Sequence, residues 1–94
     1  LTVGNTVLTY DQWSIAYREE QRILPQKEFQ LLYKLLSFPG QIFTRQQLLD
    51  DVWGGNGDSH TLDVHISRLR EKIRDIPDFE IETIRGLGYR AVIQ

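Results

Sequence analysis

The spacing of hydrophobic positions changes along the chain and divides it into three parts. The first part holds short runs in which apolar and polar residues alternate, separated by turn-forming pairs at 4–5, 11–12 and 19–20. These runs are Leu1–Val3, Thr6–Tyr10, Trp13–Arg18 and Arg22–Leu24. The pattern predicts a small antiparallel sheet of three or four strands.

A helical period replaces the alternation after Pro25, whose fixed φ suits a first helical turn. Glu28 then lies near the positive end of the helix dipole, and Pro39-Gly40 stops the helix. The apolar residues form one stripe of Phe29, Leu32, Tyr33 and Leu36 and a second of Leu31 and Leu35. Because a helix that is apolar on two sides must be covered on both, we expect it to pack between the sheet and the other helices.

Two further helices and two strands complete the predicted order. Thr44 and Gln47 have the spacing of a capping box, and Gly54-Gly55 ends the helix that they begin. A third helix is expected from about His60 to Asp75, capped by Asp58 or Ser59. The runs Phe79–Ile84 and Tyr89–Ile93 around Arg85–Gly88 predict a terminal hairpin. The fold class is therefore α+β.

Length and composition restrict the possibilities. A chain of 94 residues with 40% hydrophobic content forms one domain, and no apolar run approaches the roughly 18 residues of a membrane span. We expect no membrane partner and a cytoplasmic location. Cysteine and methionine are absent, and the start at Leu1 predicts that the chain is a piece of a longer protein. No cofactor is expected, and no metal, because His60 and His65 have no third ligand.

Charge is uneven although the formal net charge is only −2. Basic residues gather at Arg68, Arg70, Lys72 and Arg74 and again at Arg85 and Arg90. Enzymatic function is not expected, since the adjacent Asp50 and Asp51 point about 100° apart on a helix and cannot act as a facing acid and base.

The third helix carries the candidate chemistry. Helical geometry turns Leu62, Ile66, Leu69 and Ile73 toward the core. The opposite side then presents His60, Val64, Ser67, Arg68 and Glu71. An arginine can bind guanine and a small apolar side chain can contact the thymine methyl, so this face fits the major groove of DNA. Arg85, on a glycine-flanked turn, fits a narrow minor groove. The alternatives are an ordinary solvated face and a module that binds another protein.

Four blocks of sequence resemble the effector domains of OmpR/PhoB-type response regulators. They are residues 24–32, 38–49 with Val52-Trp53-Gly54, Thr61–Ile73, and Ile84–Arg90, and the resemblance runs from about residue 22 to residue 92. The resemblance implies a winged helix-turn-helix with an N-terminal four-stranded sheet, three helices and a C-terminal hairpin wing. Pro25 stands where many members have a hydroxyl cap, so the first helix is expected to start a residue later.

The resemblance also implies roles for individual residues. Asp63, Val64 and Arg68 are similar to positions that read the major groove. Positions similar to those that meet phosphates are Trp53, His60, Thr61, His65, Ser67 and Arg70. Thr83 and Tyr89 are similar to positions that flank the wing contact of Arg85, and Gly86 keeps the tip of the wing slim beside it. Gly54, Gly55, Asn56, Gly57, Asp58 and Ser59 match a loop, about two residues shorter here, that such proteins are thought to present to RNA polymerase. His60 replaces what is usually Arg.

The partners that the resemblance implies reach beyond this chain. They are double-stranded DNA with direct-repeat half-sites, RNA polymerase, and a sensor histidine kinase that acts on an N-terminal receiver domain. The isolated domain is expected to be monomeric in solution and to form a homodimer on DNA.

Overall fold

The computed structural model describes all 94 residues and begins with a four-stranded antiparallel sheet. Its strands are β1 (Thr2–Val3), β2 (Thr6–Thr9), β3 (Ser14–Tyr17) and β4 (Glu20–Ile23), in that order across the sheet, with a 3-10 helix, η1 (Tyr10–Gln12), between β2 and β3. The predicted sheet is confirmed with four strands. The last strand begins two residues before the expected Arg22, because the turn is made by Arg18 with a left-handed φ of 56°.

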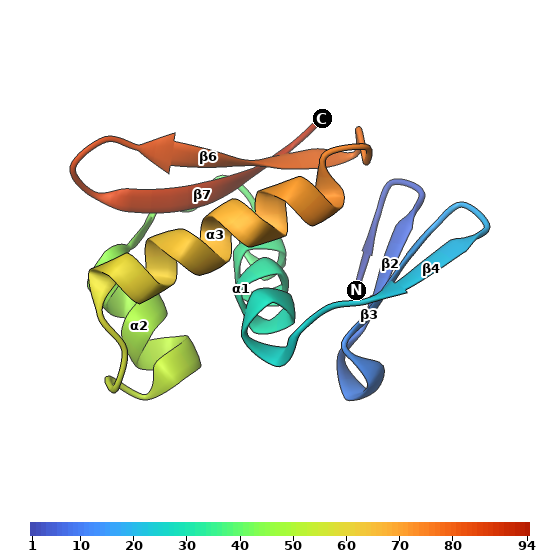
Figure 1. The fold of residues 1–94 in the computed structure, drawn as a ribbon. Coiled ribbons are helices and arrows are strands. Elements are labelled where there is room, and N and C mark those ends of the chain that lie inside the picture. The colour runs from blue at the N-terminus through green and yellow to red at the C-terminus, as the bar shows by residue number, and fades with distance from the viewer.

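Three helices follow the sheet: α1 (Gln26–Ser37), α2 (Arg45–Trp53) and α3 (Ser59–Ile73). Figure 1 shows α3 crossing in front of α1, with the C-terminal strands above both. Leu31 and Leu35 are fully buried, as are Phe29 and Leu32, which confirms that α1 is covered on two sides. No helix is both long enough and apolar enough to span a lipid bilayer.

The ends of the helices follow from local chemistry. Thr44 and Gln47 form the predicted capping box of α2, and Gly54 ends that helix with a left-handed φ of 62°. Asp58 caps α3 by accepting from the Thr61 backbone N–H at 2.8 Å. Helix α3 was expected from about His60 to Asp75. It begins one residue earlier, at Ser59, and ends two residues earlier, at Ile73. The helix stops at Ile73, whose carbonyl accepts from the Ile76 N–H in a tighter turn.

The C-terminal hairpin is part of a larger sheet than the sequence predicts. Strands β6 (Phe79–Ile84) and β7 (Gly88–Ile93) form the expected hairpin, and a short strand, β5 (Phe43–Thr44), pairs with the other edge of β7. The contact between β5 and β7 is very close, because a Cβ atom added at Gly88 would lie 2.0 Å from the carbonyl oxygen of Phe43. Position 88 therefore requires glycine for space.

All 22 buried hydrophobic residues belong to one core cluster that includes side chains from both sheets and all three helices. A single acid lies among them. The Glu28 side chain is only 3% exposed and accepts from the Lys72 Nζ of α3 at 2.6 Å. The sequence placed Glu28 correctly in the first turn of α1 but gave no sign that a lysine 44 residues away neutralises it.

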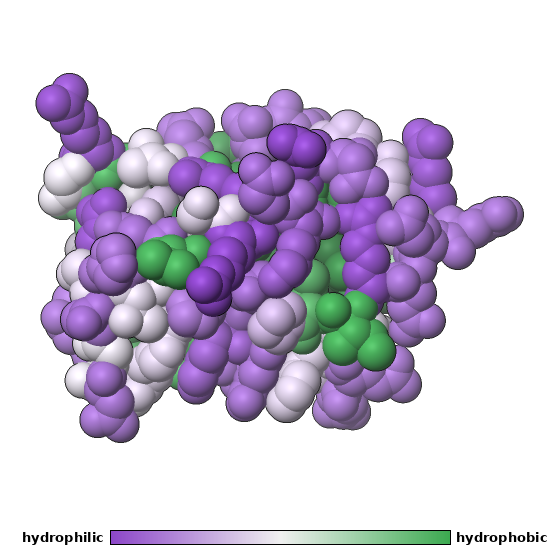
Figure 2. Space-filling model, in the orientation of Figure 1, coloured by the Kyte–Doolittle hydropathy of each residue, from purple (hydrophilic) through white to green (hydrophobic).

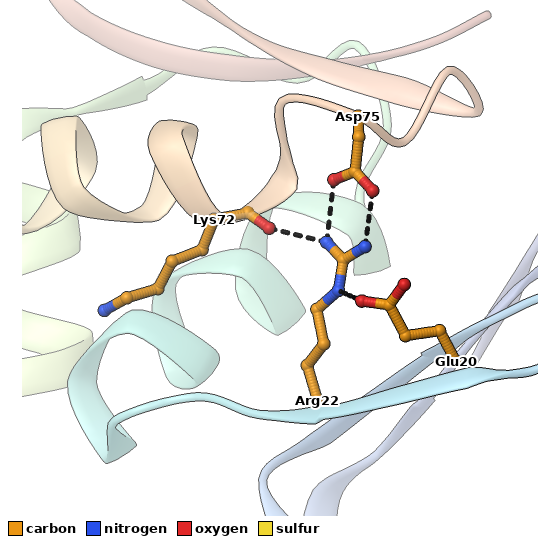
Figure 3. A network of polar contacts seen from close by, with 4 residues as sticks. All are labelled: Glu20, Arg22, Lys72 and Asp75. Carbon is orange, nitrogen blue, oxygen red and sulfur yellow. Dashed lines mark hydrogen bonds and ion pairs between the residues drawn. The ribbon is translucent and has the colours of Figure 1, made fainter.

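Polar contacts join the N-terminal sheet to the end of α3. The Arg22 guanidinium of β4 donates to both carboxylate oxygens of Asp75, to the Lys72 carbonyl and to Glu20 (Figure 3). Nearby, the Asp78 carboxylate accepts from the Asn5 backbone N–H at 2.9 Å and from the Thr6 hydroxyl at 2.8 Å. The segment between α3 and β6 is thus held against the sheet at two points.

Candidate nucleic-acid interface

Helix α3 has the two faces that the sequence predicts. Leu62, Ile66, Leu69 and Ile73 are buried, and the opposite side carries the exposed residues His60, Ser67, Arg68 and Glu71 with the half-buried Val64 between them. The side of the molecule on which α3 lies is mostly hydrophilic, with a few separate hydrophobic patches (Figure 2). Val64 is therefore an apolar side chain among the exposed polar residues of α3.

The turn between β6 and β7 extends beyond the helices (Figure 1). Gly86 takes a left-handed φ of 77°, and the Leu87 N–H donates to the Ile84 carbonyl at 2.9 Å, which closes the turn. Arg85 and Thr83 are exposed, and the Arg85 guanidinium makes no hydrogen bond or ion pair within the chain. The turn therefore presents a cation whose charge is free for a partner.

Tyr89 connects this hairpin to α2 and α3 and is only 4% exposed. Its hydroxyl donates to Asp63 Oδ1 at 2.5 Å, and Arg45 Nε of α2 donates to the same oxygen at 3.1 Å. Burial first, and then the hydrogen bond to Asp63, raise the pKa of Tyr89, so the phenol remains a donor. Partial burial alone would lower the pKa of Arg45, but the Asp63 carboxylate raises it.

Arg70 fixes the hairpin to α3 at a second place. Its guanidinium donates to the Ile81 carbonyl at 2.8 and 3.2 Å and to the Thr83 hydroxyl at 2.7 Å. The guanidinium groups of Arg45 and Arg70 also lie 5.2 and 5.5 Å from the centroid of the Tyr89 ring. The helix and the hairpin therefore form one rigid surface, since hydrogen bonds and cation–π contacts connect them.

Sequence reasoning did not find these connections. It identified Asp63, Arg70, Thr83 and Tyr89 as residues near DNA, without their bonds to one another, and it gave no role to Arg45. The partners lie between 11 and 26 residues apart along the chain, so no local spacing signals them.

The corner between α2 and α3 holds three more of the predicted site residues. Trp53 is half-buried and its ring meets the His65 ring edge to face, with centroids 5.1 Å apart. His65 Nδ1 lies 2.8 Å from the Thr61 carbonyl. In the adjoining loop, Gly57 packs against Trp53, since a Cβ at Gly57 would lie 3.1 Å from that ring. This corner is packed, whereas His60 beside it is exposed.

Three of the six cations in the basic clusters form ion pairs within the chain. Lys72 pairs with Glu28, Arg74 with Glu71 and Arg90 with Glu82. On α3 and the hairpin, only Arg68 and Arg85 make neither a hydrogen bond nor an ion pair within the chain. The structure also contains no group of three acidic, histidine or cysteine side chains that could hold a metal ion.

Comparison with known proteins identifies the family. The family described as the C-terminal part of transcriptional regulatory proteins matches residues 19–91. The chain belongs to this family of OmpR/PhoB-type DNA-binding domains. The OmpR/PhoB-type domain is a DNA-binding regulatory domain and not an enzyme, as the sequence predicts.

Individual relatives agree with this assignment. The heme response regulator HssR of Staphylococcus aureus is 42% identical over 93 residues, which are 96% of this chain and 42% of that protein. The OmpR/PhoB-type domain thus spans about two fifths of the length of the curated relatives it matches.

Solved structures support the winged helix-turn-helix fold. The C-terminal domain of the nisin resistance regulator NsrR is similar with a TM-score of 0.82 and 35% identity, over 96% of this chain and 93% of that one. The Klebsiella pneumoniae RstA DNA-binding domain, in complex with the RstA box, gives a TM-score of 0.84 and 29% identity, over 98% of this chain and 95% of that one.

Proposed function

We infer that this domain binds double-stranded DNA in a sequence-specific manner, with α3 in the major groove and the β6–β7 turn in an adjoining minor groove. The observation that carries the proposal is the rigid pairing of these two elements. Arg70 ties α3 to β6, and the Asp63–Tyr89 bond ties α3 to β7, so one surface presents both free cations, Arg68 and Arg85. A duplex offers adjoining grooves to such a surface.

Within the major groove, Arg68 binds a guanine edge and Val64 contacts a thymine methyl. Both lie on the side of α3 opposite its buried stripe. Ser67 and His60 are exposed on the same side and lie close to the DNA backbone. Arg85 enters the minor groove, where narrow A·T tracts attract a guanidinium.

The packed corner between α2 and α3 supports the DNA-binding surface and contributes little to the recognition of base sequence. Trp53 and His65 contact each other, and the half-buried Thr61 provides the carbonyl next to the His65 ring, so these residues meet phosphates only through their outer edges. We therefore expect changes at this corner to weaken binding to all duplexes alike, because phosphate contacts carry no sequence information.

The experiment selects duplexes from a random pool with the wild-type domain and then measures affinity for the selected and a scrambled duplex at several salt concentrations. Arg68→Ala should lower discrimination between the two by about 1–3 kcal/mol, the usual loss with one bidentate base contact. Arg18→Ala is the matched control, since Arg18 is exposed in the turn between β3 and β4, at the other end of the molecule from the β6–β7 turn (Figure 1). Wild-type affinity and preference in Arg68→Ala, or a pool in which no sequence is enriched, would refute the proposal.

We further propose that the domain is the output part of a longer response regulator with an N-terminal receiver that a sensor histidine kinase phosphorylates. The supporting facts are that the relative HssR is named a response regulator and that the domain spans 42% of its length. The isolated domain is then monomeric and pairs on direct-repeat half-sites about one helical turn apart. Sedimentation of the domain with and without the selected duplex tests this, and a tight dimer without DNA would contradict it.

Contact with RNA polymerase is a separate proposal that concerns the loop Gly54–Ser59. Its residues are exposed except Gly57, and Asp58 is occupied as the cap of α3. Asn56→Ala should reduce transcription from a promoter that carries the selected site while leaving DNA affinity unchanged. Equal transcription with the variant and the wild type would exclude Asn56 from such a contact.

A further inference from the structure

The two carboxylate oxygens of Asp63 are in different situations. Oδ1 accepts from the Tyr89 hydroxyl at 2.5 Å and from Arg45 Nε at 3.1 Å. Oδ2 makes no hydrogen bond within the chain, and the side chain is 43% exposed. An isolated carboxylate rotates so that its oxygens exchange places, but two donors from two other elements hold this one in a single orientation.

Both donors are themselves immobilised by the fold. Tyr89 is buried and pairs with Phe43 across β5 and β7, which directs its hydroxyl toward Asp63 of α3. Arg45 directly follows the cap of α2, and its backbone N–H donates to the Leu87 carbonyl at 3.1 Å. The orientation of Asp63 is thus set by residues whose own positions depend on the hairpin.

We propose that Tyr89 and Arg45 are positioning residues that set the base preference of α3 through Asp63, by keeping Oδ2 as the only atom of that side chain available to a base. The proposal rests on the proposed DNA-binding function and deepens it. Asp63 directly precedes Val64 and is half-buried at the edge of the exposed face. A carboxylate oxygen accepts from the amino group of cytosine, so the base selected there is cytosine.

The same geometry predicts what an amide does at position 63. In Asp63→Asn the side-chain oxygen must occupy the place of Oδ1, because Tyr89 and Arg45 both offer hydrogens there. The NH2 group then takes the place of Oδ2 and offers a hydrogen to the base. Preference should therefore move from cytosine to bases with an acceptor at the major-groove edge, such as guanine or thymine.

Tyr89→Phe tests the positioning role, since it removes one hydroxyl and keeps the ring that both guanidinium groups contact. Tyr33→Phe is the matched control. Tyr33 is a half-buried tyrosine of α1 whose hydroxyl makes no hydrogen bond within the chain. Each variant is first checked for folding by urea denaturation. Selections from a random pool with the wild type and with Asp63→Asn first identify the base pair at which the two preferred sequences differ. The affinity of each variant is then measured for four duplexes that differ only at that base pair.

We expect Asp63→Asn to change the ratio of the affinities for the cytosine duplex and for the best acceptor-base duplex by at least about tenfold. The acceptor-base duplex should then bind more tightly than the cytosine duplex. Tyr89→Phe should lower the cytosine preference roughly fivefold, the change that one ordinary hydrogen bond gives, and leave affinity for the other three duplexes within about a factor of two. Tyr33→Phe should match the wild type. A merely structural role for Tyr89 would weaken all four duplexes alike.

Two results would overturn the inference. One is a Tyr89→Phe domain with the cytosine preference of the wild type, or with uniform weakening. The other is an Asp63→Asn domain that loses the cytosine preference without gaining one for an acceptor base, or that diverges from the wild type at no position. A wild-type domain that enriches no sequence contradicts the DNA-binding proposal itself, so the two failures are distinguishable.

Discussion

Gly88→Ala tests how closely β5 must approach β7. The added Cβ would lie 2.0 Å from the Phe43 carbonyl oxygen and 2.9 Å from the Thr44 Cα, both backbone atoms that no rotamer change can move. Carbon and oxygen atoms in contact are about 3.3 Å apart, so the two strands must separate by about 1.3 Å. Overpacking of this kind costs about 1–3 kcal/mol, and loss of one strand hydrogen bond adds about 1 kcal/mol. We therefore expect a loss of about 2–4 kcal/mol in the free energy of unfolding.

Urea denaturation followed by circular dichroism measures this loss, with Gly86→Ala as the control. Gly86 lies in the same hairpin and has no atom within 4 Å of an added Cβ, but its φ of 77° strains any other residue. That variant should lose only about 1–2 kcal/mol. If Gly88→Ala is as stable as Gly86→Ala or more so, the close approach of β5 is not what excludes a side chain from position 88.

Three other predictions concern charged residues. Lys72→Met leaves the buried Glu28 carboxylate without its partner and should lower the free energy of unfolding, measured by urea denaturation, by about 1–3 kcal/mol. Combining Lys72→Met with Glu28→Gln should recover part of that loss. A Lys72→Met variant as stable as the wild type would contradict this. The hydrogen bond from Arg22 lowers the pKa of Asp75, so the ion pair contributes stability above the ordinary aspartate pKa of 3.8 and loses it as the pH falls through the lower folded-state value. The stability difference between wild type and Asp75→Asn should therefore be constant near neutral pH and shrink as the pH falls below 3.8, and a difference that does not change with pH would be the contrary result. His60→Arg should tighten DNA binding and steepen the salt dependence by up to roughly one phosphate equivalent, and an unchanged slope would place residue 60 away from the backbone.

The sequence predicts those parts of the fold that local chemistry determines. The apolar stripes of α1 and α3, the capping box at Thr44 and the hairpin around Gly86 all depend on residues within a few positions of one another. The two-residue strand β5 was missed because so short a segment has no period, and its strand character comes only from pairing with β7.

The candidate site was predictable to a similar degree. The exposed side of α3 follows from helical geometry, so the placement of Val64 and Arg68 could be predicted. The bonds of Asp63 and Arg70 could not, because each joins elements that only the tertiary fold brings together. A pattern of charges shows which residues are cationic, but not which of them already have an anion.

The small number of cations without an anion affects how such a domain searches a genome. On the helix and hairpin, Arg68, Arg70 and Arg85 have no carboxylate partner. We therefore expect roughly three counterions to be released on contact with an arbitrary sequence, for a slope of log affinity against log salt of about −3. We expect brief residence on nonspecific DNA, with little time spent sliding along any one stretch. On the proposed assembly, we expect longer occupancy only at the correct bases or where a second tethered copy raises the effective concentration of the domain at its site. We therefore expect a chromosome crowded with incorrect sites to retain few of these molecules.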